Sequence, residues 1–255
     1  MIQTRTGLFE TNSSSTHAIA VTLDRDTKFV IRDLYNTWRN YNFSFGRETY
    51  RILENWDEKL GYIYTVLLDL ENYKYRVFPE IDIPKFKTRV LKVYQEVVEE
   101  IKNNSKDGFD LSDPDLPDIT PDQIMQILDF INDRTLGLIP KNTKPNFKVD
   151  YKFEDLLNDS YGPYVDHTEP FYVSSGDDRR FTDPCVDFIE KLMSSDDYLK
   201  YFLFSDESYI TIGGDEYRGY NLKTLGFEDD YNDESEWDKR VEEYRKTHDV
   251  YFKGN

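Results

Sequence analysis

The residues best suited to chemistry lie in one short polar segment near the N-terminus. ETNSSSTH, residues 10–17, places eight consecutive polar side chains between two segments with the pattern of short strands. Ser13 and Ser14 are candidate nucleophiles, with His17 close by as a base. Glu10 could orient that imidazole or act as a general acid/base itself. The segment therefore indicates a catalytic site or a polar binding site.

The same segment also suits the binding of an anion. The side chains of Asn12, Ser15 and Thr16, together with backbone N–H groups, can donate hydrogen bonds to a phosphate or a carboxylate. A Ser/Thr-rich turn can equally use its hydroxyls on its own backbone. The sequence leaves both interpretations open.

Two further stretches supply groups of the same kind. Asp166 and His167 lie in a middle loop, and Asp215 follows a strand predicted near the C-terminus. We predict His167 as a catalytic residue and Asp166 and Asp215 as ligand-binding residues, if folding brings them to segment 10–17. No metal site is predicted, because the histidines and carboxylates lack the tight spacing of a motif such as HExxH.

Four segments resemble one family. RTGLFETNSSSTHAI is similar to the N-terminal signature FETNSSSxHS of a family of uncharacterised proteins from bacteriophages and some bacteria. EKLGYIYTVLLDL (58–70), YVDHTEP (164–170) and FLFSDESYITIGGDE (ending at 216) are similar to later elements of that family. The sequence departs from the pattern at Ala18, where the family has serine, and at Gly214, where asparagine is usual. The resemblance implies a viral setting and brings no established activity.

Charge and composition exclude several classes of protein. The 255 residues carry 50 Asp and Glu against 32 Lys and Arg, a formal charge of −18, while residues 1–53 alone are mildly basic. Binding to a nucleic-acid backbone is disfavoured by this charge, but the N-terminal part could face a small anionic ligand. A single cysteine excludes an internal disulfide framework. With no apolar run of membrane-spanning length, we expect a soluble cytoplasmic protein, in the host cytoplasm if it is viral.

Hydrophobic periodicity predicts an α+β fold. Strands are expected at 1–9, 17–23 and 28–32, and a hairpin from YFLF (201–204) and SYITI (208–212). Helices are expected at 56–71, at 84–104, from Pro121 after a Thr120 cap, at 184–199 and at 234–247, with a short helical candidate at 153–157. His248 is expected as a solvated residue of the last, charged helix. We predict one domain over 1–255, with a helical sub-region at 54–135. In this domain, a small antiparallel sheet from the N-terminal and C-terminal strands packs with about five helices.

Two functions remain open at this point. The first is a phage-type protein whose polar pocket on residues 10–17 binds or acts on a nucleotide or phosphoester. The alternative is a non-catalytic, acidic viral interaction protein that binds or inhibits a host or viral protein. The sequence does not indicate which cofactor, if any, the chain binds, and it does not decide whether the chain is an enzyme.

Overall fold

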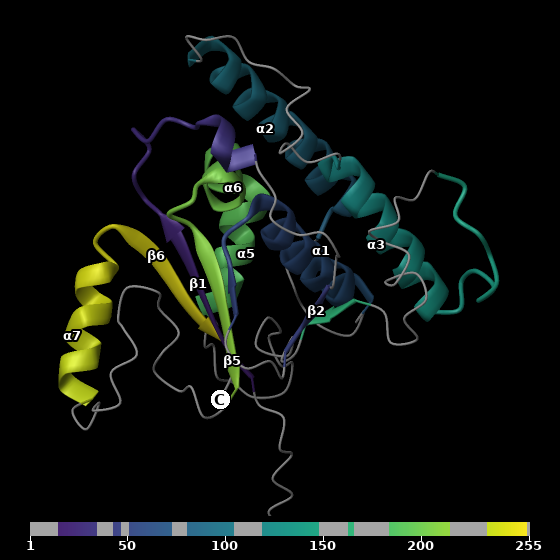
Figure 1. Cartoon of the computed structure of the whole chain (residues 1–255). Coiled ribbons are helices and arrows are strands. Elements are labelled where there is room, and N and C mark those ends of the chain that lie inside the picture. The colour runs from purple at the N-terminus through teal and green to yellow at the C-terminus, as the bar shows by residue number, and fades with distance from the viewer. Residues whose placement is uncertain are drawn as a thin grey trace, which may run out of the picture.

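A small antiparallel sheet forms the centre of the fold (Figure 1). The computed structural model describes residues 15–34, 43–46, 51–72, 81–104, 119–147, 163–165, 184–214 and 234–253. The strand order is β3-β5-β1-β6, with the bounds Arg51–Leu53, Tyr209–Gly214, Ser15–Thr22 and His248–Lys253. Both ends of the chain therefore build one sheet, which confirms the predicted α+β class and the predicted origin of its strands.

Helices supply most of the remaining described structure. They are α1 (Trp56–Asn72), α2 (Ile83–Asn104), α3 (Pro121–Thr135), α5 (Pro184–Ser194), α6 (Asp196–Phe204) and α7 (Glu234–Tyr244), with a short 3₁₀ helix at Ile31–Leu34. Two short strands, β2 (Ser44–Phe45) and β4 (Tyr164–Val165), pair in parallel beside α1. None of these described helices is long and apolar enough to cross a membrane.

The first three helices begin where the sequence predicts. The Thr120 side chain accepts a hydrogen bond from the Gln123 backbone N–H, and the Gln123 side chain accepts one from the Thr120 N–H, which completes a capping box in front of Pro121. The predicted apolar stripe of α2 is buried: Phe86, Val90, Val93, Val97 and Ile101. Local sequence signals therefore suffice to place these helices.

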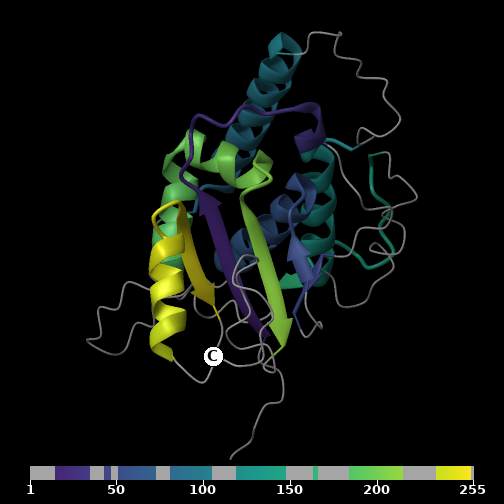
Figure 2. The same cartoon turned by 60° about the vertical axis from the view of Figure 1, so that its left-hand side comes forward.

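The sheet has two differently covered faces. Ile19, Ile210 and Leu53 occupy one cross-strand row and belong to the large core shared with α1, α5 and α6. Ala18, Ala20 and Tyr209 point to the opposite face, where a smaller cluster includes Val241 of α7. Figure 2 shows α1 behind the sheet and α7 in front of β6.

Residues 28–32 do not form the predicted strand. Residues 23–30 are irregular and lead into the 3₁₀ helix at Ile31–Leu34. The Asp33 carboxylate accepts a hydrogen bond of 2.7 Å from the Val30 backbone N–H, which stabilises this turn. Phe29 is buried and Val30 is exposed. The pattern that predicted a strand therefore belongs to a loop in which the Phe29 side chain packs into the core.

The predicted strand at 201–204 is instead the last turn of α6. The predicted helix over 184–199 is interrupted at Ser195, whose side chain accepts a hydrogen bond from the Tyr198 N–H and starts α6. All four residues of YFLF are buried. An apolar run buried on every side has no periodicity, so a strand and a helix look alike in sequence.

The C-terminal helix is shorter than predicted and a strand follows it. Helix α7 ends at Tyr244, and His248 begins β6, which pairs antiparallel with β1. The His248 ring is half-buried and stacks on Tyr244 at 4.2 Å, so it is not a solvated helical residue. Burial lowers the pKa of His248. The segments predicted at 1–9 and 153–157 lie outside the described residues.

Gly61 gives a direct test of this packing. A Cβ at this helical position would overlap Cε1 and Cδ1 of the buried Phe43 ring. We expect Gly61→Ala to lower the free energy of unfolding by about 1–3 kcal/mol, although alanine favours an isolated helix. Urea denaturation measures the change. In a Phe43→Leu background the same substitution should cost less, and an equal cost in both backgrounds would show that the overlap is not its cause.

Candidate functional site

His17 is the one predicted site residue whose side chain the structure describes, and it is fully buried. It lies on β1, and its Nδ1 is 2.8 Å from the hydroxyl of Tyr62 on α1. The exposed fraction of His17 is 0%. The ring is therefore held between the sheet and α1, with its orientation set by Tyr62.

The remaining predicted site residues are placed only in part. Ser15 and Thr16 are described as the first two residues of β1. The others lie outside the described residues: Glu10, Asn12, Ser13, Ser14, Asp166, His167 and Asp215. Their neighbours in the chain show where these segments meet the described core.

Two of the predicted segments reach the sheet at the same end. Ser15 pairs with Gly214 across β1 and β5. Because the two strands are antiparallel, β1 begins where β5 ends, as Figure 1 shows. Segment 10–14 directly precedes Ser15 in the chain, and Asp215 directly follows Gly214. Ser15 and Gly214 are paired at one end of the sheet.

A third segment connects to His17 through aromatic contacts. Val165, which directly precedes Asp166 and His167, pairs with Phe45 across β4 and β2. The Phe45 ring meets the Tyr62 ring edge-on at 5.2 Å, and Tyr62 contacts His17. Val165 is therefore linked to the buried imidazole by two intervening side chains.

A cationic side chain lies in the same row of the sheet as His17. Arg51 on β3 and His17 on β1 both lie opposite Ile212 of β5, so they share one face and are about 10 Å apart across the sheet. Arg51 donates a hydrogen bond of 3.0 Å to Glu58 and lies over the Phe45 ring at 5.5 Å. Burial raises the pKa of Glu58, and the Arg51 guanidinium opposes that shift.

This geometry limits what His17 can do chemically. A general base must come within hydrogen-bonding distance of the proton that it removes. The His17 side chain has no exposed surface, and its Nδ1 is within hydrogen-bonding distance of the Tyr62 hydroxyl. The imidazole therefore packs between β1 and α1 and does not face the solvent. The arrangement favours a positioning role for His17 over direct proton transfer to a dissolved substrate.

Sequence reasoning missed a buried lysine on the same helix. Lys59 is 0% exposed, and its Nζ donates hydrogen bonds of 2.8 Å to the backbone carbonyls of Ser205 and Ser208. Burial lowers the pKa of Lys59 to about 7, while the nearby carboxylates of Asp206 and Asp33 oppose the shift. Both acceptors are main-chain oxygens, so these two hydrogen bonds connect α1 to the turn between α6 and β5. Lys59 follows Asp57 and Glu58 in the first turns of the helix, and such a run of charged residues is an ordinary surface pattern, so no sequence signal marks it.

The described residues contain no group of three or more His, Cys, Asp or Glu side chains arranged to hold a metal ion. Where two carboxylates do meet, a lysine lies between them. The Lys191 ammonium is 3.0 Å from Asp187 and 2.9 Å from Asp249, and it also donates to the Tyr251 hydroxyl. This cluster ties α5 to β6.

Comparisons with known proteins add no functional assignment to this geometry. No protein-family model, no curated protein and no solved structure matches the chain. The functional argument therefore depends on the residues and contacts given above.

The hydrogen bond between His17 and Tyr62 can be tested directly. Tyr62→Phe should lower the free energy of unfolding by about 1–3 kcal/mol, because it leaves a buried imidazole nitrogen without its hydroxyl partner. The matched control is Tyr94→Phe. Tyr94 packs on Trp56 and Phe204, and its hydroxyl has no hydrogen bond to another described residue. Equal losses in urea denaturation of the two variants would contradict the role of the bond.

The burial of Lys59 predicts a pH dependence of stability. Its folded pKa of about 7 lies below the value near 10.4 of a free lysine, so the unfolded chain binds more protons between these limits. The free energy of unfolding should therefore rise with pH from 7 to 9.5, by up to about 1.4 kcal/mol per pH unit. Denaturation at several pH values measures the slope.

Lys59→Met should remove this rise, whereas Lys85→Met at an exposed position of α2 should retain it. A slope that persists unchanged in Lys59→Met would show that another group is responsible.

Proposed function

We propose that this chain binds a small phosphate-bearing ligand, of the nucleotide or phosphoester class, at the end of the sheet where β1 begins and β5 ends. The observation that carries the proposal is the pairing of Ser15 with Gly214. Ser15 directly follows Ser13 and Ser14 in the hydroxyl-rich segment, and Gly214 directly precedes Asp215. Hydroxyl and backbone N–H donors gathered at one place are the groups that bind phosphate oxygens.

The charges next to this end are compatible with an anionic ligand. Arg51 and His17 lie in the row of the sheet near the start of β1, and residues 1–53 carry more bases than acids. Most of the chain's formal charge of −18 lies elsewhere in the sequence. Arg51 is paired with Glu58, so the anion would be held mainly by hydroxyl and backbone N–H donors, which can bind an anion to a protein that is acidic overall.

Binding is better supported than hydrolysis. Hydrolysis with Ser13 or Ser14 as nucleophile requires a base in contact with the hydroxyl, and the buried ring of His17 is engaged by Tyr62. A catalytic form of the proposal assigns proton transfer to Glu10 or His167. We propose this catalytic form as the second possibility for the same site, and the experiment below distinguishes it from the binding form.

The alternative, an acidic protein that binds a host or viral protein, has less support from the described surface. On α7, Glu242 and Glu243 form ion pairs with Arg245 and Lys246 one turn away. These pairs reduce the net negative charge that this helix presents. The phage-type setting and a cytoplasmic location remain part of the proposal, on the strength of the resemblance of segment 10–17.

Calorimetric titration of the full chain with inorganic phosphate and adenosine 5′-monophosphate tests the proposal. We expect saturable binding, and a loss of at least about tenfold in affinity for the Ser13→Ala/Ser14→Ala variant, because two hydrogen bonds to an anion are removed. Ser194→Ala is the matched control, since the exposed Ser194 hydroxyl bonds only within α5, to the Glu190 and Lys191 carbonyls.

Absence of saturable binding of either probe, or equal affinity of the double variant and the control, would overturn the proposal. Hydrolysis of p-nitrophenyl phosphate distinguishes its two forms. Activity that is lost in Glu10→Gln or His167→Gln would support the catalytic form, and binding without turnover would support the binding form.

A further inference from the structure

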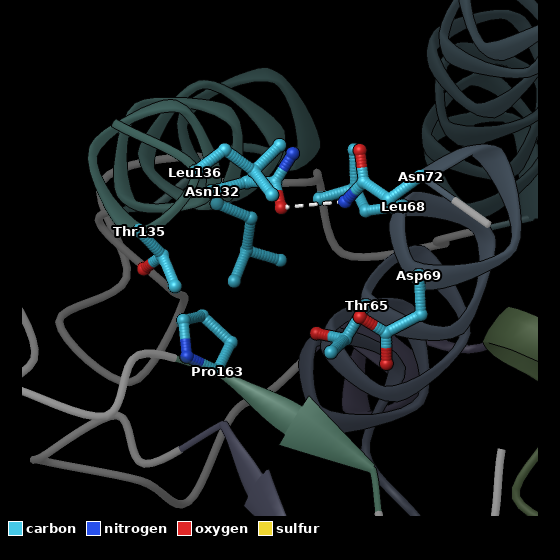
Figure 3. Close-up of a pocket in the computed structure, with 9 residues that line it drawn as sticks. Thr65, Leu68, Asp69, Asn72, Asn132, Thr135, Leu136 and Pro163 are labelled. Atoms are coloured by element: carbon cyan, nitrogen blue, oxygen red, sulfur yellow. Dashed lines mark hydrogen bonds between the residues drawn. The ribbon is translucent and has the colours of Figure 1, made fainter. Parts of the chain in front are cut away.

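A cavity lies between α1 and α3. It has a volume of about 290 Å³, near the lower limit of small-molecule pockets and above the roughly 150 Å³ of an apolar protein cavity that binds benzene. Figure 3 shows Thr65 of α1 on one side, Thr135 of α3 on the other, and Pro163 below. None of the described residues that line the cavity belongs to the four-stranded sheet, so it is a site separate from the sheet end.

Most of the lining is apolar. Carbon surface comes from α1 through Leu68, from α3 through Leu128 and Leu136, and from Pro163. Leu68 and Leu128 are buried, so they form the inner part of the cavity, whereas Leu136 is 47% exposed. A guest therefore gains affinity chiefly by moving its own apolar surface out of water.

The lining favours a guest without charge. None of the described lining residues is basic, so an anion would lie in the cavity without a counter-charge. Asp69 is the acidic residue of the described lining, and it already has an interaction partner of its own, so its carboxylate is not assigned to a guest. Because a charge is costly to remove from water without a partner, an uncharged guest fits best.

Thr65 provides a buried polar contact on the α1 side. Its exposed fraction is 3%, and its hydroxyl donates to the Gly61 carbonyl at 2.8 Å. A hydroxyl has one proton, so the Thr65 oxygen can only accept a further hydrogen bond. A guest that meets this oxygen must therefore bring a donor.

The other polar side chains of the lining are bonded within the protein. The Thr135 hydroxyl, at an exposed position, donates to the Ile131 carbonyl at 2.9 Å. Asn72 Nδ2 donates to Asn132 Oδ1 at 3.1 Å, as Figure 3 shows. A single buried acceptor within an apolar lining matches a guest that has one donor and is otherwise apolar.

We propose that the cavity between α1 and α3 binds a small uncharged molecule with one hydroxyl group on an apolar skeleton. Its hydroxyl donates to the Thr65 oxygen, and its skeleton packs on Leu68 and Leu128. All of its hydrogen bonding takes place on the α1 side, so the guest does not have to span the cavity. This ligand differs in charge and chemistry from the one proposed at the sheet end, and neither proposal depends on the other.

An NMR titration of the full chain with phenol and toluene tests the proposal. We expect phenol to give saturable shifts of the Leu68 and Leu128 methyl resonances at pH 7, with a dissociation constant on the order of 1 mM for so small a ligand. Thr65→Val keeps the shape of the side chain and removes the accepting oxygen. It should weaken phenol binding by at least about threefold and should not weaken toluene binding, because only phenol loses a hydrogen bond.

Two control variants separate this hydrogen bond from general effects of substitution. Thr65→Ser retains the hydroxyl and should bind phenol at least about twofold more tightly than Thr65→Val does. Thr88→Val on α2 removes a helical hydroxyl that donates to the Pro84 carbonyl in the same way, and it should leave the binding of both probes unchanged.

A second pair of variants tests the site if Thr65→Val fails to fold. Leu136 and Leu138 are both exposed, but Leu136 lines the cavity and Leu138 is not among its described lining residues. Leu136→Ala should weaken phenol binding by about threefold, because it removes apolar surface that the guest covers. Leu138→Ala should leave phenol binding unchanged.

Charged probes test the preference for an uncharged guest. Benzoate and benzylammonium carry a similar ring with opposite charges, and both should bind at least about tenfold more weakly than phenol. The proposal would be overturned by either of them binding as tightly as phenol, or by the absence of a saturable shift with phenol. It would also be overturned if Thr65→Val weakened phenol no more than toluene, or if Leu136→Ala and Leu138→Ala bound phenol equally.

Discussion

The burial of α1 is the constraint on which the rest of the structure depends. Every residue from Trp56 to Leu68 is buried, and three of them, Asp57, Glu58 and Lys59, have acidic or basic side chains. A charge inside a protein is tolerated only with close polar partners. For Glu58 and Lys59 the surrounding elements supply these partners: β3 brings Arg51 to Glu58, and the turn after α6 brings two carbonyls to Lys59. These partners fix how the sheet and α6 pack on the helix.

The two proposed sites use different parts of the same helix. Tyr62 connects α1 to His17 on the central strand, and thereby to the sheet end where Ser15 meets Gly214. Thr65 and Asp69, one and two turns later, face the cavity beside α3. A helix held on all sides is a rigid support, which suits residues that must keep a fixed geometry.

Part of this organisation can be predicted from the sequence. The periodicity of α1 and α2 and the Thr120 cap of α3 predict their positions, and the alternation of β1 and β5 predicts an antiparallel sheet from both chain ends. The unusual composition of residues 10–17 draws attention to the start of β1. These signals are local, because a cap or a stripe of apolar residues involves neighbours within a few positions.

Tertiary structure decided the rest. In the sequence, His17 is the last residue of a polar segment and the first of a predicted strand, and neither pattern shows that its ring is buried against Tyr62, 45 residues away. YFLF looks like a strand because burial on every side removes any periodicity, and only its packing against α1 and α2 identifies it as helix. Lys59 looks like a surface residue, yet its partners lie about 150 residues further along the chain. Composition and spacing describe what a segment can form by itself, whereas burial and the partners of a charge depend on which distant segments fold against it.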